Sequence, residues 1–136
     1  MFGDKKDHTP QKRIDSLIGT DTLIEGNIIF SGGLRIDGRV KGNVTADSDA
    51  ASTLVISEAA RVDGEIQVSH VVVNGTVNGP IRAHEYLELQ AKARVSGDVN
   101  YRRLEIQLGA TVQGKLASLD AAESASVVEL KRGAGN

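Results

Sequence analysis

The chain contains no cysteine and no tryptophan, and it has only two prolines, two tyrosines and two phenylalanines among 136 residues. Without cysteine it cannot form a disulfide framework or a metal site with thiolate ligands, and this composition fits a reducing compartment. No apolar run approaches the roughly 20 residues that a membrane-spanning helix needs. Because aromatic residues are so few, the core has to be built from valine, isoleucine, leucine and alanine, which suits a narrow interior with regular layers.

Charge of one sign is also lacking, since 16 basic residues stand against 18 acidic ones and the net charge is −2. A protein that binds nucleic acid through a general positive field would be strongly basic, so we expect no nucleic-acid partner. The charges are distributed unevenly, however. Residues 1–13 carry four basic against two acidic residues, whereas residues 14–116 carry ten against thirteen. A slightly basic segment therefore precedes a mildly acidic body.

Fifteen glycines are present, and eight of them stand in a five-residue motif that reads aliphatic, polar, glycine, polar, aliphatic. The motif glycines are Gly26, Gly38, Gly42, Gly64, Gly75, Gly79, Gly97 and Gly114. A second apolar pair precedes each unit, as in Leu34/Ile36 and Leu54/Ile56. The glycines that close successive units are separated by 16, 22, 15, 18 and 17 residues. A repeat of this kind indicates the architecture of the whole domain.

Alternation of aliphatic and polar residues at period two predicts β-strands with one buried and one wet face. About 17–18 residues per unit allow three short strands and three corners, so that each strand stacks in parallel on its equivalent in the next turn. We therefore predict an all-β, single-domain parallel β-helix of about six turns. The repeated glycine is expected at a bend or bulge. The spacing does not reveal the handedness.

Three segments follow from this pattern. Residues 1–13 have no periodicity and are predicted to form a disordered arm, and residues 14–116 hold every copy of the repeat. Residues 117–136 lose the repeat and become rich in alanine and serine, so they are interpreted as a flexible tail. Within the body, residues 46–52 are predicted to be a surface insertion.

Function is expected at the two ends of such a rod, because the last turns expose unpaired strand edges and neither end shows a convincing cap. Like ends that meet would build a non-polar filament, and unlike ends a polar one. The expected N-terminal interface consists of Leu17, Ile18, Leu23, Ile24, Ile28, Ile29 and Phe30. The expected C-terminal interface consists of Leu104, Ile106, Val112 and Leu116.

The run from Ile24-Glu25-Gly26-Asn27-Ile28 into the double motif of residues 34–44 resembles the opening of a bactofilin domain, and the similarity extends over about residues 14–116. The resemblance implies a right-handed, triangular β-helix in a bacterial cytoskeletal protein. It implies polymerisation into non-polar filaments without nucleotide or other cofactor. It also implies a cytoplasmic scaffold at the inner face of the membrane that recruits cell-wall hydrolases or synthases or polar proteins.

The first residues match the kind of arm that could touch a membrane, since Met1 and Phe2 precede Lys5 and Lys6. Each lysine near an anionic lipid surface contributes about 1 kcal/mol, so a single arm would bind weakly. Polymerisation would make many weak arms act together. The alternative interpretation is an ordinary initiator methionine followed by a solvated arm.

The main rival function is a trimeric β-helical enzyme of the hexapeptide type, either an acyltransferase or a metal-dependent hydratase. The spacing is not a clean hexapeptide, and His70 and His84 are expected on different faces. Asp37 and Asp63 stand at outward motif positions, where a solvated face is the simpler interpretation than a cation site. No glycine-rich phosphate loop is present. We therefore predict a protein that is not an enzyme and needs no cofactor or metal.

Overall fold

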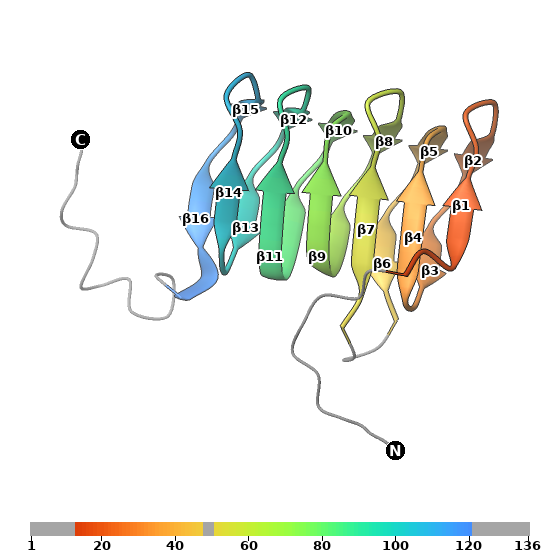
Figure 1. The fold of residues 1–136 in the computed structure, drawn as a ribbon, viewed down its shortest axis with the longest axis horizontal. Coiled ribbons are helices and arrows are strands. Elements are labelled where there is room, and N and C mark those ends of the chain that lie inside the picture. Colours follow the sequence, from red (N-terminus) through yellow and green to blue (C-terminus); the bar gives the residue numbers. More distant parts are fainter. Residues whose placement is uncertain (1–12, 48–50, 121–136) are drawn as a thin grey trace, which may run out of the picture.

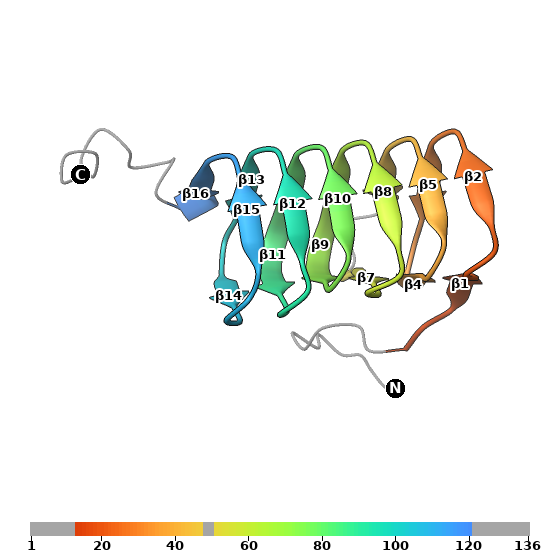
Figure 2. The same ribbon diagram turned by 90° about the horizontal axis from the view of Figure 1, so that it is seen from above.

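A computed structural model describes residues 13–47 and 51–120, and it shows a rod in which the chain winds in successive turns (Figures 1 and 2). The described residues form sixteen strands. Two of these, β9 and β11, bend around a corner and serve two turns each, so that six turns contain three strand segments apiece. Every pairing is parallel. The predicted all-β solenoid of about six turns is confirmed.

The strands line up on three faces of the rod. The first face contains β1 (Ser16–Ile18), β4 (Gly33–Ile36), β7 (Thr53–Ile56), the second halves of β9 (Ile66–Val73) and β11 (Ile81–Leu89), and β14 (Leu104–Ile106). The second face contains β2 (Leu23–Glu25), β5 (Arg39–Lys41), β8 (Arg61–Asp63), β10 (Thr76–Asn78), β12 (Arg94–Ser96) and β15 (Thr111–Gln113). The third face contains β3 (Ile28–Phe30), β6 (Val44–Ala46), the first halves of β9 and β11, β13 (Val99–Tyr101) and β16 (Leu116–Ser118).

The motif aliphatics stack in columns that run through the rod. On the second face the column reads Ile24, Val40, Val62, Val77, Val95 and Val112. Members of this column in the inner turns are buried, whereas its two terminal members, Ile24 and Val112, are only half-buried. Burial of such columns is the main stabilising contribution in a core that is poor in aromatic residues. The rod is therefore closed along its length and open at its ends.

One inward column was not recognised as such from the motif. It lies on the third face and consists of Phe30, Ala46, Val68, Ala83 and Tyr101. These residues follow the second aliphatic of each motif by two positions, which shows that the strand continues past the motif. Two strands, β9 and β11, even continue around the corner to the first face. The mixed chemistry of the column, from alanine to tyrosine, concealed it in the sequence.

The motif glycines lie at corners, as predicted. Six of the eight, one in each turn, mark the corner between the second and third faces, whereas Gly38 and Gly75 lie at the corner between the first and second faces. A Cβ atom on Gly42 would lie 2.1 Å from the carbonyl oxygen of Gly26 in the turn before it. The same 2.1 Å approach separates a Cβ on Gly64 from the oxygen of Gly42. No side chain fits into this contact, so the corner requires glycine in every turn that has a predecessor. Gly26 lies in the first turn, and a Cβ there would meet nothing within 4 Å.

Side chains at the corners also link successive turns. The Oδ1 atom of Asn27 accepts a hydrogen bond from the backbone N–H of Asn43, and the Oδ1 of Asn43 accepts one from the N–H of Glu65 (both 2.9 Å). The end of the predicted insertion is less open than expected. Ser52 is buried, and its Oγ accepts a hydrogen bond from the N–H of Ser69. The wall of the rod therefore resumes at Ser52, before the first aliphatic of its turn.

Candidate functional site: the two ends of the rod

The terminal turns are each paired on one side only. Strands β1, β2 and β3 pair with the second turn, and β14, β15 and β16 pair with the fifth. Among residues 13–47 and 51–120, no further strand pairs with their outer edges. Each end therefore presents a row of backbone N–H and C=O groups that a further strand could use.

The first turn has an inward and an outward set of apolar side chains. Ile18, Ile24 and Ile28 continue the inward columns, and they are half-buried because no turn covers them on one side. Phe30 is 9% exposed and packs in the core. Four of the seven residues predicted for the N-terminal interface therefore belong to the interior of the first turn, seen from its open end.

The other three point outward, one on each face: Leu17 on β1, Leu23 on β2 and Ile29 on β3. Their exposed fractions are 59%, 39% and 69%. The register pairs them with polar residues of the second turn, namely Arg35, Arg39 and Thr45. We call Leu17, Leu23 and Ile29 the apolar rim. It places aliphatic side chains where the next turn places charged or hydroxyl groups.

The last turn has a different outer surface. Its inward residues Leu104 and Val112 are half-buried, and Ile106 and Leu116 are more than two-fifths exposed. The outward positions equivalent to the apolar rim hold Glu105, Thr111 and Ala117. The C-terminal residues predicted from the sequence thus do lie together around the open end, but without an apolar rim.

Leu108 was missed by the sequence analysis. It lies at the corner between β14 and β15 and is 97% exposed. The three long repeat units begin at Leu54, Leu87 and Leu104, and the residue four positions on is Glu58, Ala91 or Leu108. An alignment of these units would have shown that only the last one carries a large apolar residue there. Leu108 adds an exposed aliphatic side chain to the C-terminal end.

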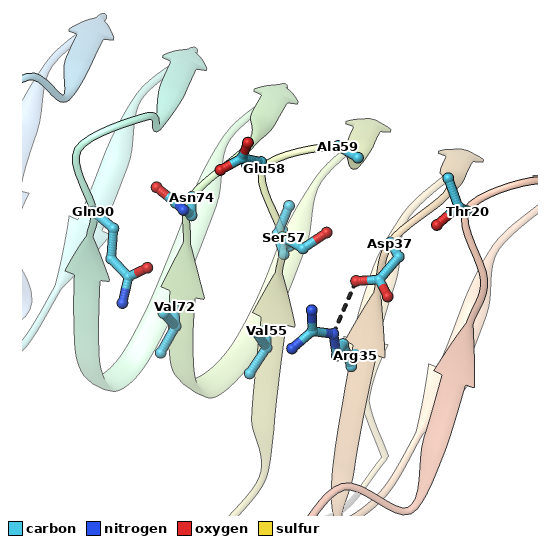
Figure 3. A pocket seen from close by; sticks show the side chains of 11 residues that line it. Thr20, Arg35, Asp37, Val55, Ser57, Glu58, Ala59, Val72, Asn74 and Gln90 are labelled. Carbon is cyan, nitrogen blue, oxygen red and sulfur yellow. Dashed lines mark hydrogen bonds and ion pairs between the residues drawn. The ribbon is translucent and has the colours of Figure 1, made fainter.

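A shallow groove runs along the first face, from Thr20 in the first turn to Gln90 in the fifth (Figure 3). Arg35, Val55 and Val72 follow one another along its floor, one from each successive turn. The Nε atom of Arg35 donates a hydrogen bond to Asp37 at 2.8 Å. A second row of polar side chains, Asp37, Ser57, Asn74 and Gln90, lies beside the floor. The groove is thus apolar in the middle and polar along one margin.

Carboxylates at the outward positions are held by neighbouring side chains or backbone groups. A hydrogen bond from Ser57, with a smaller contribution from Arg35, holds the pKa of Asp37 below its usual value. The side chain of Asn78 in the next turn does the same for the pKa of Asp63. In the first turn, the backbone N–H of Gly33 lowers the pKa of Asp15. These carboxylates are therefore satisfied by links along the rod.

The phenol of Tyr86 links the fifth turn to the last one. Its Oη donates a hydrogen bond to Oε1 of Glu105 at 2.5 Å. This bond, together with burial and the negative charge of Glu105, raises the pKa of Tyr86 to about 12. Glu105 is consequently held against the side of the rod.

The histidines lie in different surroundings. His70 is buried at the start of the first face, where its ring lies 6.4 Å from that of Tyr86, whereas His84 is exposed. Within the described part of the chain, no group of three or more His, Asp or Glu side chains is placed to hold a metal ion.

The candidate membrane-contact residues Met1, Phe2, Lys5 and Lys6 lie outside the described residues, as do most of the arm and of the C-terminal tail. Among residues 13–47 and 51–120, no helix has the length and hydropathy needed to cross a membrane.

Comparison with known proteins agrees with this geometry. The family model named "Bactofilin: Polymer-forming cytoskeletal" matches residues 16–117, from the first strand to the last. The chain belongs to the bactofilin family. The β-helix of this bactofilin and the matched region have nearly the same bounds. The family is a cytoskeletal, polymer-forming one, which supports a structural role and self-association.

Two bactofilins of Myxococcus xanthus are similar in sequence. The chain is 30% identical to bactofilin BacP over 102 residues, which cover 75% of this chain and 41% of BacP. It is 31% identical to bactofilin BacO over 114 residues, which cover 80% of this chain and 87% of BacO. The chain therefore spans less than half of BacP but most of BacO. No solved structure matches the chain.

Proposed function

We propose that the protein is a cytoskeletal scaffold whose subunits polymerise end to end into non-polar filaments, without nucleotide or metal. The observation that carries the proposal is that both terminal turns leave strand edges and aliphatic side chains uncovered by any described residue. Stacking a second subunit on such an end would pair the free edge and extend the apolar columns. The apolar surface and the unpaired strand edges that a second subunit would cover are thus at the ends of the rod.

The chemistry of the two ends favours contacts between like ends. If the last turn of one subunit met the first turn of the next, the rim residues would lie beside Glu105, Thr111 and Ala117. If two first turns met, six aliphatic side chains of two apolar rims would gather at one junction. Burial of aliphatic surface is favourable, whereas a carboxylate loses hydration beside it. Contacts between two first turns and between two last turns generate a filament without polarity.

Burial supplies enough free energy for assembly without nucleotide. Fully burying one leucine or isoleucine contributes about 1.5–3 kcal/mol, and the rim residues are roughly half exposed. Six of them at a junction of two first turns would be covered on one side and contribute on the order of 2–5 kcal/mol, to which the half-buried inward residues Ile18, Ile24 and Ile28 of both subunits would add, before the entropy cost of association. No energy from phosphate hydrolysis is required for contacts of this size.

The filament would act as a scaffold at the inner face of the cytoplasmic membrane. Met1 and Phe2 could insert beside anionic headgroups to which Lys5 and Lys6 are attracted. Many arms on one filament would bind where a single arm would not. The faces and tails would recruit cell-wall hydrolases or synthases or polar proteins.

Electron microscopy of the purified protein in nucleotide-free buffer tests the proposal. We expect unbranched filaments, whereas compact trimers would contradict it and favour a hexapeptide-type enzyme instead.

The membrane role has its own test, in which residues 1–13 are deleted and the protein is sedimented with anionic liposomes. The deletion should abolish co-sedimentation and spare the filaments. Unchanged binding of the shortened chain would disprove the role of the arm.

A further inference from the structure

The outward residues in the middle of the first face form a row with a charge order along the rod. From the first turn to the last, the row reads Leu17, Arg35, Val55, Val72, Glu88 and Glu105. The positive residue therefore precedes two half-buried valines, and the negative residues follow them. Figure 3 shows Arg35, Val55 and Val72 along the floor of the groove.

When a second copy of the row is placed opposite in reverse order, positive residues of one copy face negative residues of the other. A two-fold axis that lies between the two faces, parallel to the strands and level with the gap between Val55 and Val72, brings each valine opposite the other valine of a second copy. It brings Arg35 opposite Glu88 of that copy twice, once on each side of the axis. Sheets pack about 10 Å apart, a gap that arginine and glutamate side chains can span together over a valine centre. We propose that the first face is a lateral docking surface for the first face of a second copy in antiparallel orientation.

The groups that would form the ion pairs are available on the surface. Among the residues that the structure describes, Asp37 alone contacts the guanidinium of Arg35, and it does so through Nε, which leaves the two terminal nitrogens for a partner. Glu88 accepts hydrogen bonds from the amides of Gln90 and Gln107, which leaves its charge uncompensated. Glu105 falls opposite Leu17 at each margin of the contact, where Tyr86 holds the carboxylate of Glu105 against its own rod.

The other two faces do not have this property. The second face carries Arg39, Arg61 and Arg94 in one outward column, and its reversal brings Arg94 opposite Arg39 of the second copy. The middle row of the third face holds Thr45, Gln67, Arg82 and Asn100 in the inner turns, a single charge with no opposite partner. An anionic membrane is also a poor occupant of the first face, because Glu88 and Glu105 would be repelled. A second copy fits the charges of this face best.

The contact between two isolated subunits would be weak. Six strands about 4.8 Å apart and about three residues wide present a patch of roughly 30 by 10 Å. Two such patches fall well below the roughly 1,200 Å² that a stable complex buries. Repetition along a filament would add many such contacts. The affinity of the lateral contact therefore rests on the proposed polymerisation. We expect paired filaments in preference to free lateral dimers.

Charge reversal tests the pairing by electron microscopy at low ionic strength. Arg35→Glu and Glu88→Arg should each reduce the fraction of paired filaments at least about fivefold, without shortening the filaments, since each places like charges opposite one another. Preformed filaments of the two variants, once mixed, should pair again, because every contact then joins opposite charges. Arg61→Glu is the matched control, since it breaks the equivalent pair with Asp63 on the second face. Pairing should also be lost near 1 M salt, where charges are screened within about 3 Å, while single filaments persist.

A cross-linking measurement on the assembled filaments tests the same contact without microscopy. The chain has no cysteine, so Arg35→Cys and Glu88→Cys introduce unique reactive groups. A bismaleimide with a span of about 10 Å should join the two variants when they are mixed, and should join neither variant to itself, because like positions lie three strand spacings apart along the axis. Filament pairing that is unaffected by charge reversal, or a mixture of variants that neither pairs nor cross-links, would overturn the lateral contact alone. Loss of the filaments themselves in the native protein would count against end-to-end polymerisation instead.

Discussion

The first and last turns have the same place in the repeat, yet they present different surfaces. Both continue the inward columns, with Ile24 at one end and Val112 at the other. At the outward positions the first turn carries aliphatic residues on all three faces, whereas the last turn carries Glu105, Thr111 and Ala117. The inward columns stabilise each turn against its neighbour, and the outward positions are free to vary. Because of this difference, a contact between two first turns would bury the apolar rim. A contact between two last turns would depend on the inward side chains that are exposed at the open end.

The largest expected effect is that of the triple substitution Leu17→Arg, Leu23→Arg and Ile29→Arg. The same three columns already hold Arg35, Arg39 and Arg82 in other turns, so the fold accommodates arginine there. We expect filaments to be replaced by particles of no more than two subunits, joined at their last turns, with an unchanged circular dichroism spectrum. The measurement is electron microscopy combined with analytical ultracentrifugation.

The matched control for the rim places arginine at equivalent outward positions of the inner turns, Gln67→Arg and Thr76→Arg. These changes should leave filament length unaltered. If the control shortens filaments as much as the rim variant does, the effect arises from added charge and not from the first turn.

Gly64 in an inner turn and Gly26 in the first turn occupy the same motif position, so the same substitution at each compares the interior of the rod with its end. A Cβ on Gly64 would meet the oxygen of Gly42 at 2.1 Å, so Gly64→Ala should lower the free energy of unfolding by about 3 kcal/mol or more. Gly26→Ala has open space and should cost only about 1–2 kcal/mol for its backbone conformation, with φ at 135°. Urea unfolding of the two variants measures the difference. Equal costs would show that the turns do not approach each other as closely as the structure indicates.

A smaller effect is expected at the other end from Leu108→Glu. Glutamate occupies the equivalent corner at Glu58, so the substitution should not disturb folding. The contact between last turns would lose two partly buried leucines, one from each subunit, and should weaken by about 1 kcal/mol in total, which is roughly a fivefold rise in the critical concentration for assembly. Sedimentation over a concentration series measures this change, and Ala91→Glu in the fifth turn is the control. A critical concentration that stays the same would place Leu108 outside the junction.

The smallest effects concern pH, and they have opposite signs at the two ends. The pKa of Tyr86 is raised from 10.0 to about 12, so its bond to Glu105 contributes stability below pH 10 and loses it as the pH rises to about 12. In the first turn the pKa of Asp15 is lowered from 3.8, so its contribution is present above that pH and is lost on acidification. Tyr86→Phe should therefore melt lower than the native protein at pH 8 and equally above pH 12. Asp15→Asn should show its difference at pH 6 and lose it in acid. A difference that does not depend on pH would contradict either assignment.

The repeat predicted most of the fold but not the direction of the side chains at the first turn. In the inner turns each inward aliphatic has polar neighbours, as Val40 has in Arg39 and Lys41, so the phase of the strand is clear. In the first turn the apolar residues are consecutive, as in Ile28-Ile29-Phe30, and alternation alone cannot distinguish inward from outward. Parallel register resolves it, since Ile29 pairs with Thr45. The apolar rim therefore required the structure.

The axial repeat of the filaments tests the central claim most directly. Six turns spaced about 4.8 Å apart give a subunit length of roughly 29 Å. If like ends meet, the filament repeats only after two subunits, so averaged electron micrographs in nucleotide-free buffer should show a period of about 58 Å with two-fold axes at both junctions. A period of about 29 Å with every subunit pointing the same way would contradict the account, because the apolar rim would then lie against the polar last turn.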